Sequence, residues 1–420
     1  MADNSEKSGE EIAILQKSSL MRDMLSIYVP AFFVFLGMSI ISPILPIYAK
    51  SFDVSYTLVA FAISMYAIGR LAADLPVGVL ADRAGRKTLM MAGTVVISVA
   101  SVLNATAPNF WFFLLYRALE GVGSAMWMTS RQALLVDMLR PSERGRIMGY
   151  FQAFTMIGGA AGPTVGGLVA SIWDLRAPFY FYAVAGVVSL VLTALWVQEP
   201  KRVKSHTQQG EGFSVPVIMR LLSSRTFIMA CLATAIAFFV MTGIRGTLVP
   251  LYANNALGLN EVEIGTVLSY ATLTSLFLTI PMGYAIDYFG RKPIILIGFT
   301  LQIIATFLFS TSHDYISISL VAVLLGAGQS GAGQAPLAMA SDATAGEPHG
   351  VAMGLYRCFG DAGFIVGPIV LGIVSDNYGL VVPFYVTCTI EAVSVVLVAV
   401  FARETYKSRG KSKVEQQIHE

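Results

Sequence analysis

Gly78-Val-Leu-Ala-Asp82-Arg-Ala-Gly85-Arg86-Lys87 is a ten-residue stretch that returns 205 residues later as Gly283-Tyr-Ala-Ile-Asp287-Tyr-Phe-Gly290-Arg291-Lys292. The same offset relates Gly162-Pro163 to Gly367-Pro368 and Pro178-Phe-Tyr180 to Pro383-Phe-Tyr385. One slip near the start places Pro46 against Pro250, at an offset of 204. Because the register holds only if the landmarks are separated by equal numbers of helices, the two halves are predicted to share one topology, as parallel repeats do in secondary transporters.

The composition places both halves in a membrane. Of 420 residues, 55% are hydrophobic and 13% are charged, with a mean hydropathy of +0.67, against roughly 25% charged residues in an average soluble domain. The predicted fold is an all-α membrane protein with twelve transmembrane helices in two pseudo-symmetric six-helix bundles, because a span needs about 20 apolar residues. The predicted spans are 25–48, 57–80, 88–107, 110–132, 145–172, 177–197, 226–252, 263–285, 292–312, 315–340, 350–374 and 381–402.

The basic residues predict the orientation. With both termini in the cytoplasm, 22 of the 28 Lys and Arg residues lie on the cytoplasmic side, four lie within helices and two lie outside, which is the positive-inside pattern. The predicted organisation is a cytoplasmic N-terminal tail (1–24), a first bundle (25–197), a basic cytoplasmic linker (198–225), a second bundle (226–402) and a cytoplasmic C-terminal tail (403–420). Residues 215–222 of the linker could form a short surface helix, and the C-terminal tail is expected to be mobile and solvated.

The repeated turn also carries a chemical pattern. Gly78 and Gly85 allow tight packing and a sharp reversal, Asp82 can accept hydrogen bonds from backbone N–H groups, and Arg83, Arg86 and Lys87 hold the loop in the cytoplasm. A charged turn without further role is the alternative.

The complete pattern resembles the signature of the major facilitator superfamily, G-x-L-a-D-r-x-G-r-k, between helices two and three. The second copy, with Asp287, Gly290 and Arg291, lacks the Arg after the Asp. The resemblance implies a conformational latch, in which Asp82 bridges to helix eleven while the outward-open state lasts. It also implies a monomer in the cell (inner) membrane.

The predicted fifth helix contains closely spaced glycines and a proline: Gly158, Gly162, Pro163, Gly166 and Gly167. Glycines four apart lie on one face and let helices approach closely, so a packing face is one interpretation. The stretch is also similar to the antiporter motif of the superfamily, g-x-x-x-G-P-x-x-G-G, which is found mainly in proton-driven exporters. This resemblance favours export.

Four charged residues fall deep inside predicted spans. Arg117 and Glu120 lie three apart in helix four, and Arg357 and Asp361 lie four apart in helix eleven. Because charges near the middle of a membrane are costly unless they pair or face water, each couple is either a structural ion pair or a proton-coupling site. Asp361 has no charged counterpart in the first half, and the resemblance suggests proton coupling for Arg117. Arg245 and Glu391 also fall inside spans, without an assigned role.

A set of aromatic and methionine side chains could together line a central cavity for apolar ligands, although ordinary packing is the alternative for each one alone. The set is Tyr66, Trp127, Met128, Phe154, Tyr270 and Tyr356. Gly326-Ala-Gly328-Gln-Ser-Gly331 matches a dinucleotide-binding pattern but lies inside a predicted membrane helix, where close helix packing explains it. No metal-binding spacing and no phosphate-cradling loop occurs, so neither a cofactor nor ATP nor a nucleic-acid partner is expected.

The sequence therefore predicts a secondary transporter rather than an enzyme. We expect a proton-coupled antiporter that exports small amphiphilic compounds by alternating access, as multidrug efflux transporters do. Three alternatives remain. One is a symporter or uniporter for a nutrient or organic acid, the second is a lipid or lysolipid transporter, and the third is a membrane sensor that transports nothing.

Overall fold

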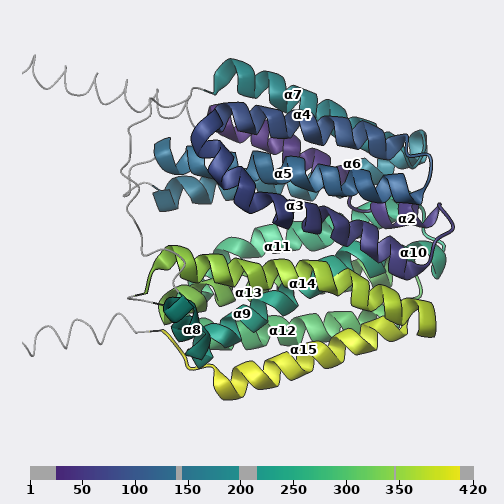
Figure 1. Cartoon of the computed structure of the whole chain (residues 1–420). Coiled ribbons are helices and arrows are strands. Elements are labelled where there is room, and N and C mark those ends of the chain that lie inside the picture. The colour runs from purple at the N-terminus through teal and green to yellow at the C-terminus, as the bar shows by residue number, and fades with distance from the viewer. Residues whose placement is uncertain (1–24, 139–143, 198–214, 345–346, 407–420) are drawn as a thin grey trace, which may run out of the picture. The chain divides into compact units, whose positions relative to one another are not determined.

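The structure, a computed structural model, describes residues 25–138, 144–197, 215–344 and 347–406, and all regular elements in these residues are helices (Figure 1). Ten of these helices are long and apolar enough to cross a membrane, and the shorter apolar helix Leu25–Ile41 precedes them. The first residue of each predicted span lies within two residues of the first residue of a described helix. The all-α membrane fold is therefore confirmed, and the predicted linker helix is present as α8 (Val215–Ser223).

The described helices group into two compact units, one within residues 25–48 and 65–197 and the other within residues 49–64 and 215–406. In the first unit, α4 packs against both α5 and α7. In the second unit, α12 packs against both α13 and α15. The helices of the first half are α2 (Leu45–Lys50), α3 (Tyr56–Ala84), α4 (Arg86–Ala105), α5 (Phe110–Met138), α6 (Arg144–Ile172) and α7 (Ala177–Trp196). Those after α8 are α9 (Arg225–Phe239), the π-helix η1 (Val240–Leu248), α10 (Val249–Asn255), α11 (Glu261–Phe289), α12 (Arg291–Phe309), α13 (Tyr315–Ala343), α14 (His349–Tyr378) and α15 (Val382–Phe401).

The start of α3 groups with the second unit because α14 binds it. The Asp376 carboxylate accepts hydrogen bonds from the backbone N–H groups of Tyr56, at 2.7 Å, and Thr57, at 2.9 Å. These are N–H groups that a helix N-terminus leaves without an intrahelical partner, so the carboxylate of Asp376 caps α3. Further along α3, the Ser64 hydroxyl donates to the carbonyl of Ile365 at 2.7 Å. From Met65 onward the same helix belongs to the first unit.

The repeat seen in the sequence is also a repeat of contacts. Gly85 and Gly290 directly precede α4 and α12, with φ of 96° and 99°, values that favour glycine. The ammonium of Lys87 donates to the carbonyl of Ala194 at 2.8 Å, and that of Lys292 donates to Ala399 at 2.7 Å. The donors and the acceptors of this pair are both 205 residues apart, so the two units conserve the same connection between neighbouring helices.

Each unit breaks its first membrane helix before the matching proline. In the first unit the helix ends at Ile41, and α2 begins one residue before Pro46. In the second unit the break is η1, a nine-residue π-helix that ends two residues before Pro250. Proline has no backbone N–H, so the regular hydrogen-bond ladder has to change before it. The Thr247 hydroxyl bonds to the carbonyl of Thr242, five residues earlier, at 2.7 Å.

The glycines of α6 bring this helix against the helix Leu25–Ile41. A Cβ atom added to Gly162 would overlap the side chain of Ser39, and one added to Gly166 would overlap the carbonyl oxygen of Ile40. The same arrangement occurs in the second unit, where a Cβ on Gly363 of α14 would overlap the carbonyl of Ala235. The close-packing interpretation of these glycines is therefore confirmed. The glycines of α13 likewise pack closely, since a Cβ on Gly326 would overlap the carbonyl of Ala271.

This close packing predicts the cost of a larger residue. Gly166→Leu should lower the free energy of unfolding by about 1–3 kcal/mol, because the new side chain meets the Ile40 backbone, which cannot rotate away. The measurement is thermal unfolding of the purified protein in detergent micelles. Gly354→Ala is the control, since nothing lies within 4 Å of a Cβ there, and alanine favours a helix. Equal unfolding temperatures for the two variants would contradict the prediction.

Candidate functional site

The turn that carries the first copy of the repeated pattern lies between α3 and α4. Gly85 makes the reversal, the guanidinium of Arg86 donates to the carbonyl of Ala133 at 2.6 Å, and Lys87 binds Ala194. The side chain of Asp82 lies outside the described residues. The expectation of tight packing at Gly78 is wrong within the described structure, because no atom lies within 4 Å of a Cβ placed there. Arg83 is exposed.

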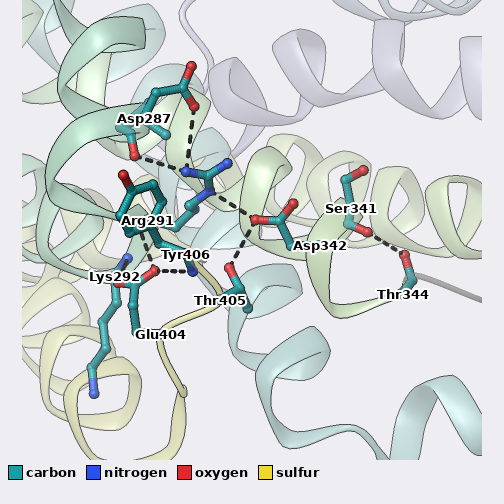
Figure 2. Close-up of polar contacts among 10 residues, drawn as sticks. Asp287, Arg291, Lys292, Ser341, Asp342, Thr344, Glu404, Thr405 and Tyr406 are labelled. Carbon is teal, nitrogen blue, oxygen red and sulfur yellow. Dashed lines mark hydrogen bonds and ion pairs between the residues drawn. The ribbon is translucent and has the colours of Figure 1, made fainter. Parts of the chain in front are cut away.

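The turn with the second copy of the pattern, between α11 and α12, is built around one arginine (Figure 2). The guanidinium of Arg291 donates from Nε to the carboxylate of Asp342 at 2.9 Å and lies 3.5 Å from that of Asp287. It also donates to the carbonyl of Ile286 at 3.1 Å and lies over the ring of Tyr406. Arg291 therefore joins the end of α11, the end of α13 and the chain that follows α15.

The chain after α15 is not the freely solvated tail that the sequence predicts, at least as far as Tyr406. The carboxylate of Glu404 accepts hydrogen bonds from the backbone N–H groups of Arg291, at 3.0 Å, and Lys292, at 2.9 Å, and so caps α12 (Figure 2). The Thr405 hydroxyl donates to Asp342 at 3.1 Å. We call residues 403–406 the C-terminal strap.

A sequence signal for the C-terminal strap exists. Glu404 lies 205 residues after Glu199, so the repeat includes an acidic residue directly after each bundle. Composition favoured a mobile tail because the residues after Tyr406 are rich in Lys and Ser. The cap depends on one residue, Glu404, and a prediction from the average composition of the tail does not detect the contact of a single residue.

In the first unit, Arg117 and Glu120 form an ion pair inside the helices. Nη1 of Arg117 lies 2.6 Å from Oε2 of Glu120, which also accepts from the Asn104 amide at 2.8 Å. Arg117 is 4% exposed and Glu120 is 0% exposed. The guanidinium of Arg117 also lies over the ring of Tyr66, whose hydroxyl bonds to Ser124 at 2.6 Å. The two charges form an ion pair and neutralise each other, and proton coupling by this pair stays a prediction.

In the second unit, α14 places Arg357 and Asp361 one turn apart. Asp361 is 9% exposed and Arg357 is exposed. At about 1.5 Å per residue, Asp361 lies roughly 18 Å from the beginning of α14 and roughly 25 Å from its end. Glu391 of α15 is 0% exposed, and in the part of the chain that the structure describes its carboxylate oxygens meet no hydrogen-bond partner within the geometric limits.

The side chains predicted to line a cavity fall into two groups. Tyr66, Trp127 and Tyr356 are buried within their own units, and the Tyr356 hydroxyl bonds to that of Thr234. Met128 and Phe154 are half-buried, and Tyr270 is 39% exposed. Their contact with a ligand stays a prediction. Among the described residues, no cluster of three or more His, Cys, Asp or Glu side chains could hold a metal ion.

Because Glu404 caps α12, we expect replacement of its side chain to destabilise the protein. Glu404→Ala should lower the free energy of unfolding by about 1 kcal/mol, because two N–H groups at the start of α12 lose their acceptor. Thermal unfolding in detergent micelles measures this effect. Thr405→Val is the matched control, since it removes one hydrogen bond to Asp342 and leaves the cap intact. If both variants unfold at the wild-type temperature, the C-terminal strap does not stabilise the unit.

Curated proteins with similar sequences include transporters. Quinolone resistance protein NorA of Staphylococcus aureus (strain COL) is 24% identical over 375 residues, which cover 89% of this chain and 95% of NorA. An uncharacterized MFS-type transporter of Methanocaldococcus jannaschii is 24% identical over 363 residues, covering 86% of this chain and 93% of that protein.

Solved structures of transporters share the fold. A crystal structure of the nucleoside transporter NupG superimposes with a TM-score of 0.77 at 13% identity, covering 90% of this chain and 100% of that one. The D-xylose-proton symporter gives a TM-score of 0.76 at 15% identity, with coverages of 92% and 98%. The family model of the Major Facilitator Superfamily matches residues 27–260 and 230–420. The chain therefore belongs to the Major Facilitator Superfamily, whose members are membrane transporters of small molecules.

Proposed function

We propose that this transporter exports small amphiphilic compounds in exchange for protons, by alternating access, and that Asp361 takes up and releases the proton. It would act as a monomer in the cell membrane with both termini in the cytoplasm, as the distribution of 22 of its 28 basic residues suggests. The observation that supports this proposal most is the position of Asp361, a buried carboxyl group near the middle of a membrane helix.

Glu120 is poorly suited to proton exchange, which is why we assign the proton to Asp361. The Glu120 carboxylate already accepts hydrogen bonds from the Arg117 guanidinium and the Asn104 amide, so taking up a proton there would disturb an ion pair. Asp361 lies two residues before Gly363, where α14 packs against α9. A change of protonation at this position would therefore act on a helix contact within the second unit.

The direction of transport is supported by α6 and by similarity. The glycines Gly158, Gly162 and Gly166 resemble the antiporter motif, and they form the close contact of α6 with the helix Leu25–Ile41. NorA, named as a quinolone resistance protein, covers 89% of the chain. Exchange requires that protons and substrate differ in their affinity for the two orientations of the transporter, since a ligand that binds both orientations equally shifts nothing.

The direction of proton movement tests the proposal. Purified protein in liposomes is given an imposed pH gradient, and the flux of fluorescent amphiphiles is recorded together with internal pH. We expect substrate and protons to move in opposite directions. Movement in the same direction would make the protein a symporter, and the absence of flux across a broad compound panel would favour a membrane sensor.

Asp361→Asn should abolish substrate movement that is driven by the pH gradient, because Asn cannot bind or release a proton. Passive exchange of substrate at equal pH should persist, which separates lost coupling from lost folding. Asp314→Asn is the matched control: Asp314 caps α13 through the backbone N–H of Ser317 at 2.7 Å, and Asn caps helices equally well. Gradient-driven flux at the wild-type rate in Asp361→Asn would rule out the assigned role.

A further inference from the structure

Arg245 lies deep within the span Arg225–Asn255. It is ten residues before Asn255 and twenty after Arg225, which corresponds to roughly 15 Å and 30 Å along a helix. Arginine side chains near a helix end can extend their charge to the membrane surface. Arg245 is too far from either end for that, so its charge needs an interaction at this depth.

Few hydrogen-bond acceptors surround the Arg245 guanidinium among the described residues of the second unit. Among the residues that the structure describes, the only hydrogen-bond partner of the Arg245 guanidinium is the Thr272 hydroxyl of α11. That hydroxyl in turn donates to the carbonyl of Leu268 at 2.9 Å, so its oxygen is oriented toward the arginine. A guanidinium has five N–H donors. Among the described residues of the second unit, the other donors have no hydrogen-bond acceptor, and no carboxylate lies within ion-pair distance of Arg245.

The first unit holds an arginine that is paired inside its helices. Arg117 is 4% exposed, and Glu120 neutralises it at 2.6 Å. Among the described residues of the second unit, Arg245 has no such counter-ion, and it is only partly buried. Because an uncompensated arginine near the centre of a membrane is costly, such residues usually mark the path of a substrate or an ion.

The local backbone also leaves space beside this charge. Arg245 lies within the π-helix η1, and π-helical turns are frequent at functional sites. The next residue, Gly246, has no side chain, and the nearest heavy atom to a Cβ placed there is the carbonyl oxygen of Met241 at 3.5 Å. A ligand atom could therefore approach the backbone next to the guanidinium.

From these observations we infer that Arg245 binds an anionic group of the transported compound, so that the substrates are anionic or zwitterionic amphiphiles. The planar guanidinium presents pairs of N–H donors that match two oxygens of a carboxylate, phosphate or sulfonate. Thr272 is a positioning residue that orients the guanidinium. The inference rests on the proposed function in one respect only, namely that the bound compound is the one transported.

The test is equilibrium binding to the purified protein in detergent, without a pH gradient. Three fluorescent probes share one ring system and differ in charge: dansylglycine is anionic, dansylglycinamide is neutral and dansylcadaverine is cationic. We expect dansylglycine to bind about tenfold or more tightly than either other probe, because a hydrogen-bonded charge pair contributes that much. The naphthylacetate and naphthylacetamide pair repeats the comparison on a second scaffold. Equal binding of the anionic and neutral members, or no binding of the anions on either scaffold, would overturn the inference.

Variants locate the effect. Arg245→Gln should bind dansylglycine and dansylglycinamide equally, whereas Arg245→Lys should keep a reduced preference because it retains the charge but not the paired donors. Thr272→Val should reduce the preference a few-fold, and it carries the test if the Arg245 variants do not fold. Arg176→Gln, at an exposed arginine between α6 and α7, is the matched control and should bind as the wild type does. A full preference for the anion in both Arg245→Gln and Thr272→Val would refute the inference.

Two further arms separate the possible outcomes. Phosphatidylglycerol added to the micelles presents the same anionic chemistry from a lipid. If it stabilises the wild type but not Arg245→Gln, while dansylglycine has no effect, the site belongs to a lipid and the assignment to a substrate is wrong. Because binding is measured without a gradient, failure here leaves proton exchange intact. Failure of proton exchange with preserved anion binding would instead remove the proposed function.

Discussion

The absence of water within the bilayer is the constraint on which this structure depends. Every backbone group has to be satisfied inside the protein, so the described chain is helical. Some hydroxyl groups in the spans are satisfied locally: Thr94, Thr272 and Thr387 each donate to a carbonyl four residues earlier in the same helix. Charges cannot be satisfied in that way, because a backbone carbonyl does not neutralise them. We therefore distinguish charges that pair within the protein from charges for which we propose a proton or a substrate as the partner.

The duplication helps to separate these two classes. Contacts that occur in both units serve the scaffold, as Lys87 and Lys292 do when each binds a carbonyl of the sixth helix of its half. The charges deep inside the spans have no such counterparts. An offset of 205 residues pairs Asp361 with Met156 and Arg357 with Gln152, and the local offset of 204 pairs Arg245 with Ile41. A departure from the repeat does not by itself assign a function, because Arg117 and Glu120 also fall opposite uncharged residues and form an ion pair.

Sequence reasoning succeeded where a physical property is summed over many residues. Apolar length is such a property, and each predicted span begins within two residues of a described helix. Reasoning from sequence was weaker where one contact decides. It expected a free tail, but the Glu404 carboxylate caps α12. It expected close packing at Gly78, where a Cβ would meet nothing, although the same argument was right for Gly162 and Gly166, which lie against another backbone.

The sequence alone determined the membrane fold, the duplicated topology and the places where charges enter the spans, because hydropathy and periodic spacing are written along the chain. Tertiary structure decided how each charge is balanced, because that depends on which side chains of other helices come within hydrogen-bonding distance. The sequence left open whether Arg117 and Glu120 pair with each other. In the fold they form an ion pair, and the Asn104 amide donates a hydrogen bond to Glu120. Arg245 was one charge among several inside the spans, and among the described residues of the second unit the fold gives it one hydrogen-bond partner, the Thr272 hydroxyl of α11.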